Sequence, residues 1–303
     1  MSINLSAIRS LLLPGLYNVM GDYKDIPTQW SQVCDTGVPS DQATEKSVEM
    51  RQFGLAEAQG EGQSVKYDNN AGERFSYNTI HTGIGLGFIM TRNALKDNLY
   101  KSQFEPNVKA LRFSFRQTKE IIVANLFNLG TTYDAAVGGD GVSLFNTAHL
   151  IDGGTIGNRP TIDIELNEAA LEAGIIGVRR FKNAAGLRNM FRVRKLIVPV
   201  ELQFVAERLL KTELRVGTAD NDLNAVRSMN AVSEGYVVMD FLTGTKPWFL
   251  KTDAPYGMTY TEREPFEYDI QPDQDTKSLK TVAYERYSAW YQNWRGNWGA
   301  FPT

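Results

Sequence analysis

The sequence predicts an α+β fold, and three observations lead to this class. Residues 48–90 hold seven glycines, and their apolar side chains alternate with polar ones, which is typical of a β-hairpin. Residues 104–128 carry apolar side chains at spacings of three, four and seven residues, which predicts a long helix. From 130 to 250, strand-like and helix-like segments mix as in one compact unit.

Composition narrows the classes of function. The chain has 303 residues, of which 42% are hydrophobic, so it can bury a sizeable core. Its 32 basic and 35 acidic residues nearly cancel, which argues against a strongly basic nucleic-acid binder or a polybasic membrane-surface protein. The single cysteine, Cys34, excludes an intrachain disulfide, and two histidines are too few for most metal sites and triad hydrolases.

Residues 1–47 are predicted to form an N-terminal arm. A short helix over 4–13 would end at Pro14-Gly15, and 14–47 are polar and irregular, with few expected contacts of their own. An arm of this kind needs a neighbouring molecule on which to dock. Neither a signal peptide nor a membrane-spanning stretch is recognisable, so synthesis in the cytoplasm and no membrane contact are expected.

Residues 48–90 are predicted to form an extended loop, a twisted hairpin whose tip is Gly60-Glu61-Gly62. Beyond the tip, strand-like alternation involves Val65, Tyr67, Phe75, Tyr77 and Ile80. The run from Gly83 to Gly87 resembles a phosphate-binding loop, but its third glycine comes one position too early and no parallel strand precedes it. Glycines within a strand are therefore the favoured interpretation.

The helix over 104–128 would follow a helix start at Thr91 and form a rod of roughly 37 Å, which suggests a spine for flatter elements. Further along, the patterns predict helices and strands in alternation. The helices are expected at about 166–181 and 199–212, and the strands at 193–198, 236–239 and 248–250.

The C-terminal segment 279–303 is rich in aromatic residues. Trp290, Trp294 and Trp298 recur every four residues, a spacing that fits one side of a helix. Gly296 and Gly299 limit such a helix, so burial shared between the core and an interface is the favoured interpretation.

Candidate catalytic groups are few. His149 with Asp140 or Asp152 could form a metal pair or an acid–base pair, but a loop histidine that hydrogen-bonds its turn is favoured because other imidazoles are scarce. Cys34 with a histidine could form a nucleophilic dyad, yet the arm is a poor place to fix catalytic geometry. The common hydrolase, metalloprotease and P-loop motifs are absent from the sequence.

Charge is segregated along the chain. Residues 176–195 contain seven basic residues and no acid, whereas 253–275 contain seven acids and one arginine. Nucleic-acid binding is disfavoured, and two interpretations remain level: solvated faces, or complementary surfaces that meet between copies of the chain. The candidate contact residues, which include two near the hairpin tip, are Glu61, Lys66, Arg179, Arg180, Arg188, Glu264, Glu267 and Asp269.

The order of these features resembles the major capsid proteins of tailed bacteriophages, most closely the Mu-like major head subunit family. The similarity to that family spans nearly the whole chain. Its strongest parts are Ser6–Leu13, Asp25–Trp30, Arg51-Gln-Phe-Gly54, Thr91–Asp97, Asp140–His149 with Gly153-Gly154 and Asn158, Leu196–Leu202 with Ala206 and Leu209-Leu210, Trp248–Leu250, and Trp294-Arg-Gly296.

The resemblance implies the Hong Kong phage type of capsid fold. The implied parts are an N-terminal arm (1–47), an extended loop (48–90), a peripheral domain (91–132 and 255–303, with the spine helix 104–128) and an axial domain (133–254). It implies no catalytic residues, no cofactor and no metal. Covalent cross-linking of subunits does not transfer with the fold, and no Lys–Asn pair is identified for it.

The resemblance also implies a function and partners. Copies of the chain would form hexamers and pentamers of an icosahedral virion shell that encloses double-stranded DNA without sequence-specific binding. A separate scaffolding protein is expected because residue 1 runs straight into the arm, so the mature subunit should keep its N-terminus. A portal protein is a further expected partner, and a decoration or cement protein a potential one.

Two alternatives remain open. The first is the shell of an encapsulin-like bacterial compartment of the same fold, which would usually begin with an internal helix rather than an arm and would enclose an enzyme cargo. The second, less favoured, is an enzyme that uses His149 and nearby acids, which would require a perturbed acid or base in a closed pocket.

Overall fold

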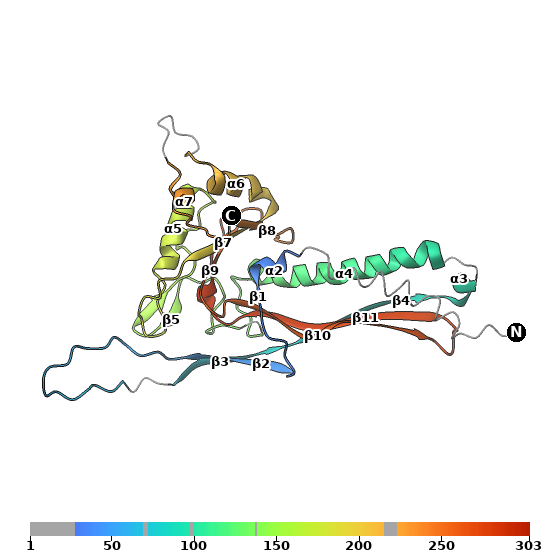
Figure 1. Ribbon diagram of the computed structural model, residues 1–303, viewed down its shortest axis with the longest axis horizontal. Coiled ribbons are helices and arrows are strands. Elements are labelled where there is room, and N and C mark those ends of the chain that lie inside the picture. The colour runs from blue at the N-terminus through green and yellow to red at the C-terminus, as the bar shows by residue number, and fades with distance from the viewer. Residues whose placement is uncertain (1–27, 69–71, 97–99, 137, 215–222) are drawn as a thin grey trace.

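The computed structural model describes residues 28–68, 72–96, 100–136, 138–214 and 223–303. Figure 1 shows three parts: a long plate of one helix and a sheet, an upright unit at one end of the plate, and a ribbon that projects beneath that unit. The helix expected over 4–13 lies outside the described residues. Within the described ranges, none of the helices has both the length and the hydropathy that a bilayer span requires.

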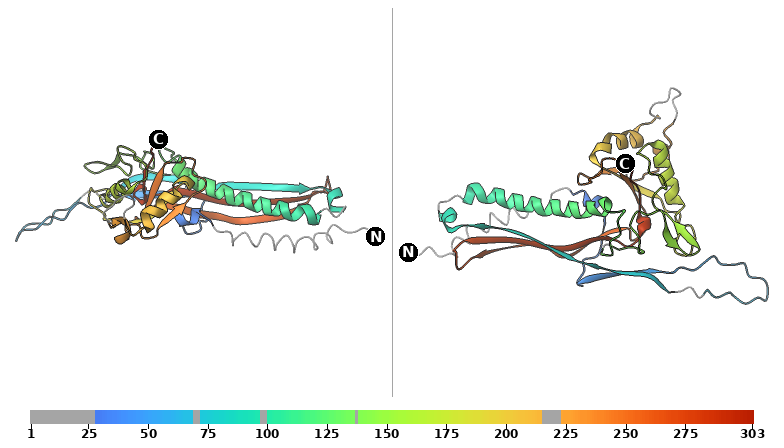
Figure 2. Two further views of the ribbon diagram at one scale, coloured as in Figure 1. Left: turned by 90° about the horizontal axis from the view of Figure 1, so that it is seen from above. Right: turned by 180° about the vertical axis from the view of Figure 1, so that it is seen from behind.

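The plate consists of α4 (Tyr100–Asn128), preceded by the short α3 (Arg92–Lys96), on a four-stranded sheet in the order β1-β10-β11-β4. The strands are β1 (Asp35–Thr36), β4 (Thr82–Met90), β10 (Met258–Pro272) and β11 (Leu279–Tyr291). Alternation along β11 turns Leu279 and Ala283 toward the helix, where they are buried with Val108, Leu111 and Phe115. The predicted long helix is confirmed, and Figure 2 shows it running along the sheet.

The projecting ribbon is a shorter hairpin than the sequence predicts. Its strands β2 (Thr44–Met50) and β3 (Glu73–Ile80) pair antiparallel, with Thr44 opposite Ile80 and Met50 opposite Glu73. Residues 51–68 form no strand, so the predicted strand around Val65 and Tyr67 is wrong. The glycines of this segment disfavour regular strands, and few β-branched residues offset them.

The glycine run belongs to the plate instead of the hairpin. Residues 82–90 form β4, which pairs antiparallel with β11 at the edge of the sheet, and the interpretation as strand glycines is confirmed. A Cβ at Gly83 would lie 2.4 Å from the Tyr284 hydroxyl, so glycine there lets that side chain lie across the strand. Only His81 separates β3 of the hairpin from β4 of the plate.

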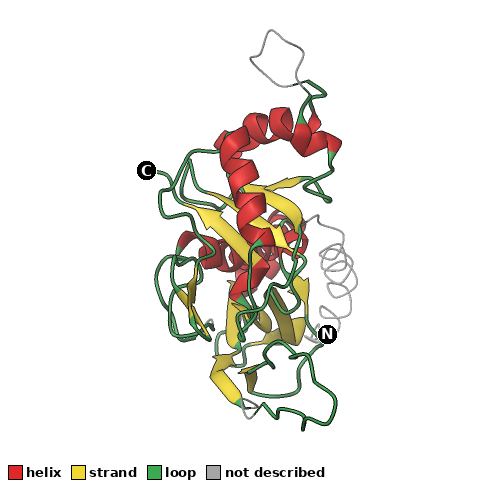
Figure 3. Cartoon of the chain, turned by 90° about the vertical axis from the view of Figure 1, so that its left-hand side faces the viewer, coloured by secondary structure: helices red, strands yellow, loops and turns green. Residues whose placement is uncertain are grey.

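The upright unit contains a second four-stranded sheet, in the order β12-β9-β7-β8. Figure 3 shows the strands and helices of the chain seen from the end at which this unit lies. Its strands are β7 (Val193–Val198), β8 (Tyr236–Val238), β9 (Trp248–Thr252) and β12 (Asn297–Ala300). The other elements are α5 (Glu168–Arg179), η2 (Val200–Leu202), α6 (Gln203–Lys211), α7 (Ala225–Ser228) and the small hairpin of β5 (His149–Ile151) and β6 (Gly154–Ile156). The predicted strand 193–198 is confirmed, and the predicted helices shorten at their ends.

Helix α5 packs closely on this sheet. The Asn167 side chain caps its start by accepting a hydrogen bond of 2.8 Å from the Ala170 amide. A Cβ at Gly174 would lie 3.0 Å from Leu250 and 3.1 Å from Trp298, so a small residue here lets helix and sheet approach.

The C-terminal tryptophans are buried, but the helical spacing does not reflect a helix. Trp290 lies in β11, Trp294 in the 3₁₀ turn η3 (Trp294–Gly296), and Trp298 in β12, and each is less than 9% exposed. Strand β12 pairs with β9, so the end of the segment assigned to the peripheral domain joins the upright unit. This placement of β12 buries Trp298 against Trp248 of β9, with 5.0 Å between the two ring centroids.

The root of the arm has more contacts than its polar sequence predicts. Both carboxylate oxygens of Glu120 on α4 accept hydrogen bonds from the backbone amides of Gln29 and Trp30, at 2.8 and 2.9 Å, at the start of α2 (Trp30–Val33). The Trp30 ring packs against Tyr260, and β1 then pairs in parallel with β10. The expectation of few contacts is therefore wrong for 28–36, because α4 and β10, which are distant in sequence, satisfy the backbone of this segment.

Candidate assembly site

A row of exposed apolar side chains lies on the segment that projects from the hairpin. Residues 51–68 extend beyond the upright unit (Figures 1 and 2). Phe53, Leu55, Val65 and Tyr67 in this segment are 65%, 80%, 60% and 85% exposed. Because exposed apolar surface is unfavourable in water, the segment has the character of a surface that another molecule covers.

The root of the hairpin is held by a buried cation. Arg295 in η3 is 4% exposed, and its guanidinium donates to Glu49 of β2 at 3.0 Å and to the backbone carbonyl of Lys182 at 2.6 Å. Arg74 of β3 lies 3.8 Å from the other oxygen of the same carboxylate. Burial lowers the pKa of the Arg295 guanidinium, and the charge of Glu49 opposes this shift.

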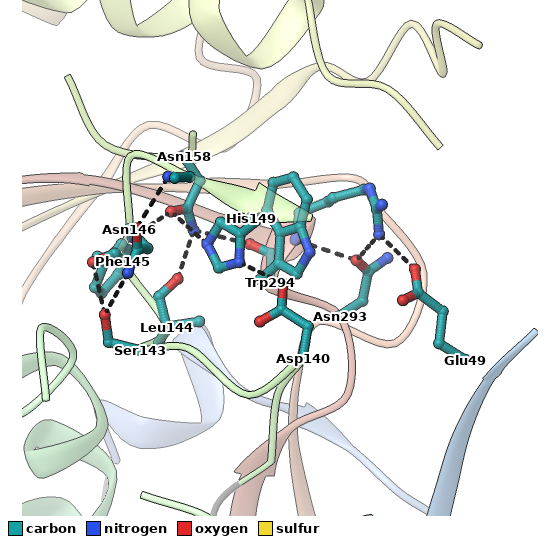
Figure 4. A network of polar contacts seen from close by, with 12 residues as sticks. Glu49, Asp140, Ser143, Leu144, Phe145, Asn146, His149, Asn158, Asn293 and Trp294 are labelled. Atoms are coloured by element: carbon teal, nitrogen blue, oxygen red, sulfur yellow. Dashed lines mark hydrogen bonds and ion pairs between the residues drawn. The ribbon is translucent and has the colours of Figure 1, made fainter. Parts of the chain in front are cut away.

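A second network continues from Arg295 into the upright unit (Figure 4). The buried His149 ring stacks on Trp294 with 4.1 Å between ring centroids, and the Arg295 guanidinium carbon lies 4.3 Å from the centroid of the Trp294 ring. The Nδ1 atom of His149 is 2.8 Å from Asp140, and its Nε2 atom is 3.1 Å from Asn158. The loop that carries Asp140 is thereby tied to the turn that holds the hairpin.

A third set of contacts fixes the junction of hairpin and plate. The buried His81 ring is 2.9 Å from the Ser288 hydroxyl of β11 and 3.3 Å from Glu45 of β2. The Tyr77 hydroxyl of β3 donates to the Tyr291 carbonyl at 2.8 Å, and burial raises the pKa of this phenol. These contacts give the hairpin a defined direction relative to the plate.

The described residues offer little for catalysis. They contain no group of three or more histidine, cysteine or acidic side chains that could hold a metal ion. Cys34 is buried, and burial raises the pKa of its thiol to about 12, so it is a poor nucleophile. A crevice of about 550 Å³ between the hairpin root and the upright unit is lined by the hairpin strands, Asp140 and Arg295. The residues of the hairpin root therefore orient the projecting segment 51–68.

The comparison with known families decides what this architecture is. Residues 77–298 match the family model described as phage capsid protein, which is more than half of the chain. The chain belongs to the phage capsid protein family. No curated protein matches the sequence of this capsid protein.

Solved shells share the fold of this capsid protein. The mature capsid of bacteriophage PhiM1 matches with a TM-score of 0.59 and 12% identity, covering 90% of this chain and 86% of that one. The capsid of the native GTA particle gives 0.58 and 11%, covering 92% of each chain. A virus-like particle from Pyrococcus furiosus gives 0.55 and 7%, covering 94% and 98%. The predicted capsid fold is confirmed.

Membership in this family also answers the question of enzyme activity. The chain is a major capsid protein, a structural component of the virion, and not an enzyme. His149 accordingly lies buried in a structural network in which Asp140, rather than the exposed Asp152, is its partner.

The structure separates the candidate residues of the two charged stretches. Arg179 and Arg180 lie exposed at the end of α5, and Arg188 is exposed in the loop that follows, all in the upright unit. Glu264, Glu267 and Asp269 lie on β10 in the plate. Within one subunit, the basic stretch 176–195 and the acidic stretch 253–275 are in contact at other residues. Asp253 accepts a hydrogen bond of 2.7 Å from the backbone amide of Arg192.

Glu264, Glu267 and Asp269 of β10 share one face of the plate. The register places Glu267 opposite Tyr284 and Asp269 opposite Val282, and Val282 is 52% exposed. Since Ala283 of the same strand is buried against the helix, this acidic face points away from α4. Glu264 faces Arg286 at 3.7 Å.

At the hairpin tip, Glu61 is exposed, and Lys66 forms an exposed ion pair with Glu57 within the segment. The hairpin root was not predicted from the sequence. Its residues, Glu49, Asn158 and Arg295, are isolated in apolar or loop contexts and carry no local periodic signal.

Proposed function

We propose that this capsid protein assembles into hexamers and pentamers that close an icosahedral shell around double-stranded DNA, and that it is a Mu-like major head subunit. The observation that carries the proposal is the exposed apolar row on residues 51–68. A stable interface buries about 1,200–2,000 Å² in total, and a projecting segment supplies such area only on another molecule. In this proposal, the segment reaches over the next subunit of the capsomer.

Electrostatic pairing between subunits adds orientation. Arg179, Arg180 and Arg188 would meet Glu264, Glu267 and Asp269 of a neighbour, while Glu61 and Lys66 would make contacts at the tip. Support comes from the position of these charges: the arginines are exposed in the upright unit, and Glu267 and Asp269 are exposed on the plate. Complementary faces on identical copies favour one relative orientation over others.

Other partners follow from a virion role. A separate scaffolding protein would guide closure, and a portal protein would occupy one vertex. The capsid of bacteriophage JBD30 is decorated with minor capsid protein trimers, and its subunit matches this chain with a TM-score of 0.56 and 15% identity, covering 72% of this chain and 92% of that one. A decoration protein is accordingly part of the proposal.

A second candidate is an encapsulin-like compartment. The match to the virus-like particle from Pyrococcus furiosus covers 98% of that chain and supports this candidate. The two candidates differ in what they enclose. Mass spectrometry and nuclease digestion of purified particles would find DNA in a phage head and an enzyme cargo in a compartment.

The experiment that tests assembly deletes residues 58–64 at the hairpin tip. We expect circular dichroism close to that of the unmodified chain, because this segment contributes little to the core, together with absent or fragile particles in the electron microscope. A matched pair of variants refines the test. Phe53→Ser with Leu55→Ser should impair particles, whereas Gln59→Ser with Gln63→Ser in the same segment should not. Normal particles from the deletion variant would refute the role of the hairpin.

A further inference from the structure

The hydrogen bonds around His149 constrain where its protons lie. The Nδ2 amide nitrogen of Asn158 lies 2.8, 3.2 and 3.1 Å from the backbone carbonyls of Leu144, Trp294 and Asn297. A nitrogen that faces three carbonyls must be the donor end of the side chain. The opposite orientation would place the Asn158 oxygen against three carbonyl oxygens, which would repel it.

This orientation fixes one proton on the histidine. The Asn158 oxygen accepts a hydrogen bond of 3.0 Å from the Asn146 amide and is 3.1 Å from His149 Nε2. Because an amide oxygen only accepts, Nε2 must carry a hydrogen. In a neutral imidazole with Nε2–H, the other ring nitrogen, Nδ1, has a lone pair and no hydrogen.

The contact on the other side of the ring then requires a second proton. Nδ1 lies 2.8 Å from Asp140 Oδ2, and both residues are buried, His149 completely and Asp140 with 7% of its surface exposed. A bare nitrogen and a carboxylate oxygen are both acceptors and would repel each other at this distance in a buried site. The other oxygen of Asp140 has no hydrogen-bond partner among the described atoms, so the contact with Nδ1 is the hydrogen bond that this side chain makes there.

We propose that His149 and Asp140 share a buried proton in addition to the one on Nε2, and that this shared proton fastens the root of the hairpin to the upright unit. The proton resides on Nδ1 or on the carboxyl group, and either position makes the 2.8 Å contact a hydrogen bond. The inference rests on the geometry of the subunit and does not depend on the proposed shell.

The charged groups around the pair are few. Arg295 lies on the far side of Trp294 and is paired with Glu49, which also faces Arg74, so two cations meet one carboxylate there. Burial raises the pKa of the Tyr291 phenol, and the nearby Asp140 adds to the shift.

The consequence reaches the hairpin through short contacts. Asp140 follows Gly138 and Gly139, and a Cβ at Gly138 would lie 2.3 Å from the Tyr291 carbonyl and 2.8 Å from the Tyr77 ring. His149 also stacks on Trp294, which directly precedes Arg295. Loss of the hydrogen bond between Asp140 and His149 would displace both contacts and loosen strands β2 and β3.

The deciding measurement is nitrogen NMR of the full-length chain with ¹⁵N-labelled histidine. The chain has only two histidines, so the variant His81→Gln leaves His149 as the sole signal. We expect Nε2–H together with either a protonated Nδ1 or, in ¹³C-aspartate spectra, a protonated Asp140 at neutral pH. A hydrogen on Nδ1 with a bare Nε2, or a bare Nδ1 beside an ionised carboxylate, would overturn the proposal.

A variant series tests the link to the hairpin. Asp140→Ala removes the partner that faces Nδ1, Asp140→Asn keeps a donor there, and Asp152→Ala changes a neighbouring exposed acid as a matched control. In Asp140→Ala, amide exchange in 44–50 and 73–80, corrected for intrinsic rates, should rise about tenfold relative to the unmodified chain. In Asp140→Asn and Asp152→Ala it should stay close to that of the unmodified chain. Equal exchange in all four proteins would show that the pair does not fasten the hairpin.

Discussion

Arg295 and Glu49 form a half-buried ion pair of 3.0 Å, although 246 positions separate them in the chain. The pair joins the C-terminal turn to the first strand of the projecting hairpin. Since Glu49 also faces Arg74 on the second strand, one carboxylate connects both strands to the body of the subunit. The direction of the projecting segment, and with it the reach toward a neighbour, depends on this residue.

Removing the charge of Glu49 should therefore destabilise the subunit. In Glu49→Gln, the amide cannot neutralise two guanidinium groups, and we expect a loss of about 1.5–3 kcal/mol in the free energy of unfolding. Urea unfolding of unassembled subunits measures this change in the free energy of unfolding. Glu57→Gln is the matched control, because Glu57 forms an exposed ion pair with Lys66 and should change stability by less than about 1 kcal/mol. Equal losses in both variants would contradict a special role for Glu49.

Two glycines of the loop before His149 allow steric and conformational effects to be separated. Gly138 and Gly141 both have positive φ, 110° and 88°, but only Gly138 is enclosed. Gly141→Ala should cost about 1–3 kcal/mol for backbone strain alone. Gly138→Ala should cost about 1–3 kcal/mol more, because its Cβ would collide with the Tyr291 carbonyl and the Tyr77 ring. Similar unfolding midpoints in urea would show that the loop adapts freely.

The buried pair of Lys119 and Glu285 predicts a pH dependence of stability. Burial raises the pKa of Glu285, and Lys119 at 3.1 Å opposes the shift without cancelling it. The folded subunit therefore takes up this proton more readily than the unfolded chain does. Its contribution to stability is complete below the ordinary value near 4.5 and is lost as pH rises through the folded pKa.

The test compares unfolding free energies of the unmodified chain and Glu285→Gln between pH 7 and pH 4.5. The unmodified chain should gain stability relative to the variant as the pH falls. Glu207→Gln is a control of opposite sign, because a hydrogen bond from Lys211 lowers the pKa of Glu207. Relative to that variant, the unmodified chain should lose stability only as the pH falls below about 4.5 through the folded pKa of Glu207, so this control is extended to lower pH. A parallel pH profile for Glu285→Gln would contradict the raised pKa.

The parts of the fold that the sequence predicts are those with a local period. Helix α4 and strand β7 are long enough for apolar side chains to repeat at 3.6 or 2 residues, and both were located correctly. The spacing of Trp290, Trp294 and Trp298 misled because a strand, a turn and another strand reproduced a helical interval by coincidence. Period alone does not reveal a change of element.

The site depends on contacts that no period records. Glu49 and Arg295, or Asn158 and the Trp294 carbonyl, are far apart in the chain and meet only in the folded subunit. In the sequence, Glu49, Arg295 and Asn158 look like ordinary surface residues. The arm root was misjudged for a similar reason. Its hydrogen bonds come from Glu120 on α4, so the polar sequence of 28–36 gives no sign of them.

The last prediction concerns contacts between subunits. In the proposed shell, Arg179 and Arg180 of the upright unit meet acids on the plate of a neighbour. Each exposed ion pair contributes only about 0–1 kcal/mol, but the pairs repeat at every subunit. Assembly should therefore be salt-sensitive, because the Debye length falls from about 10 Å at 0.1 M to about 3 Å at 1 M.

Charge reversal tests this pairing directly. Arg179→Glu with Arg180→Glu should slow or block particle formation, followed by light scattering and electron microscopy, and Glu267→Lys with Asp269→Lys should restore it in part. Arg208→Glu with Lys211→Glu, both exposed on α6 and outside both stretches, makes the same change in net charge and is the control. If the reversed arginines leave assembly unchanged but reduce the amount of packaged DNA, they face the genome, because repulsion of phosphates would then be the only effect of the new acids.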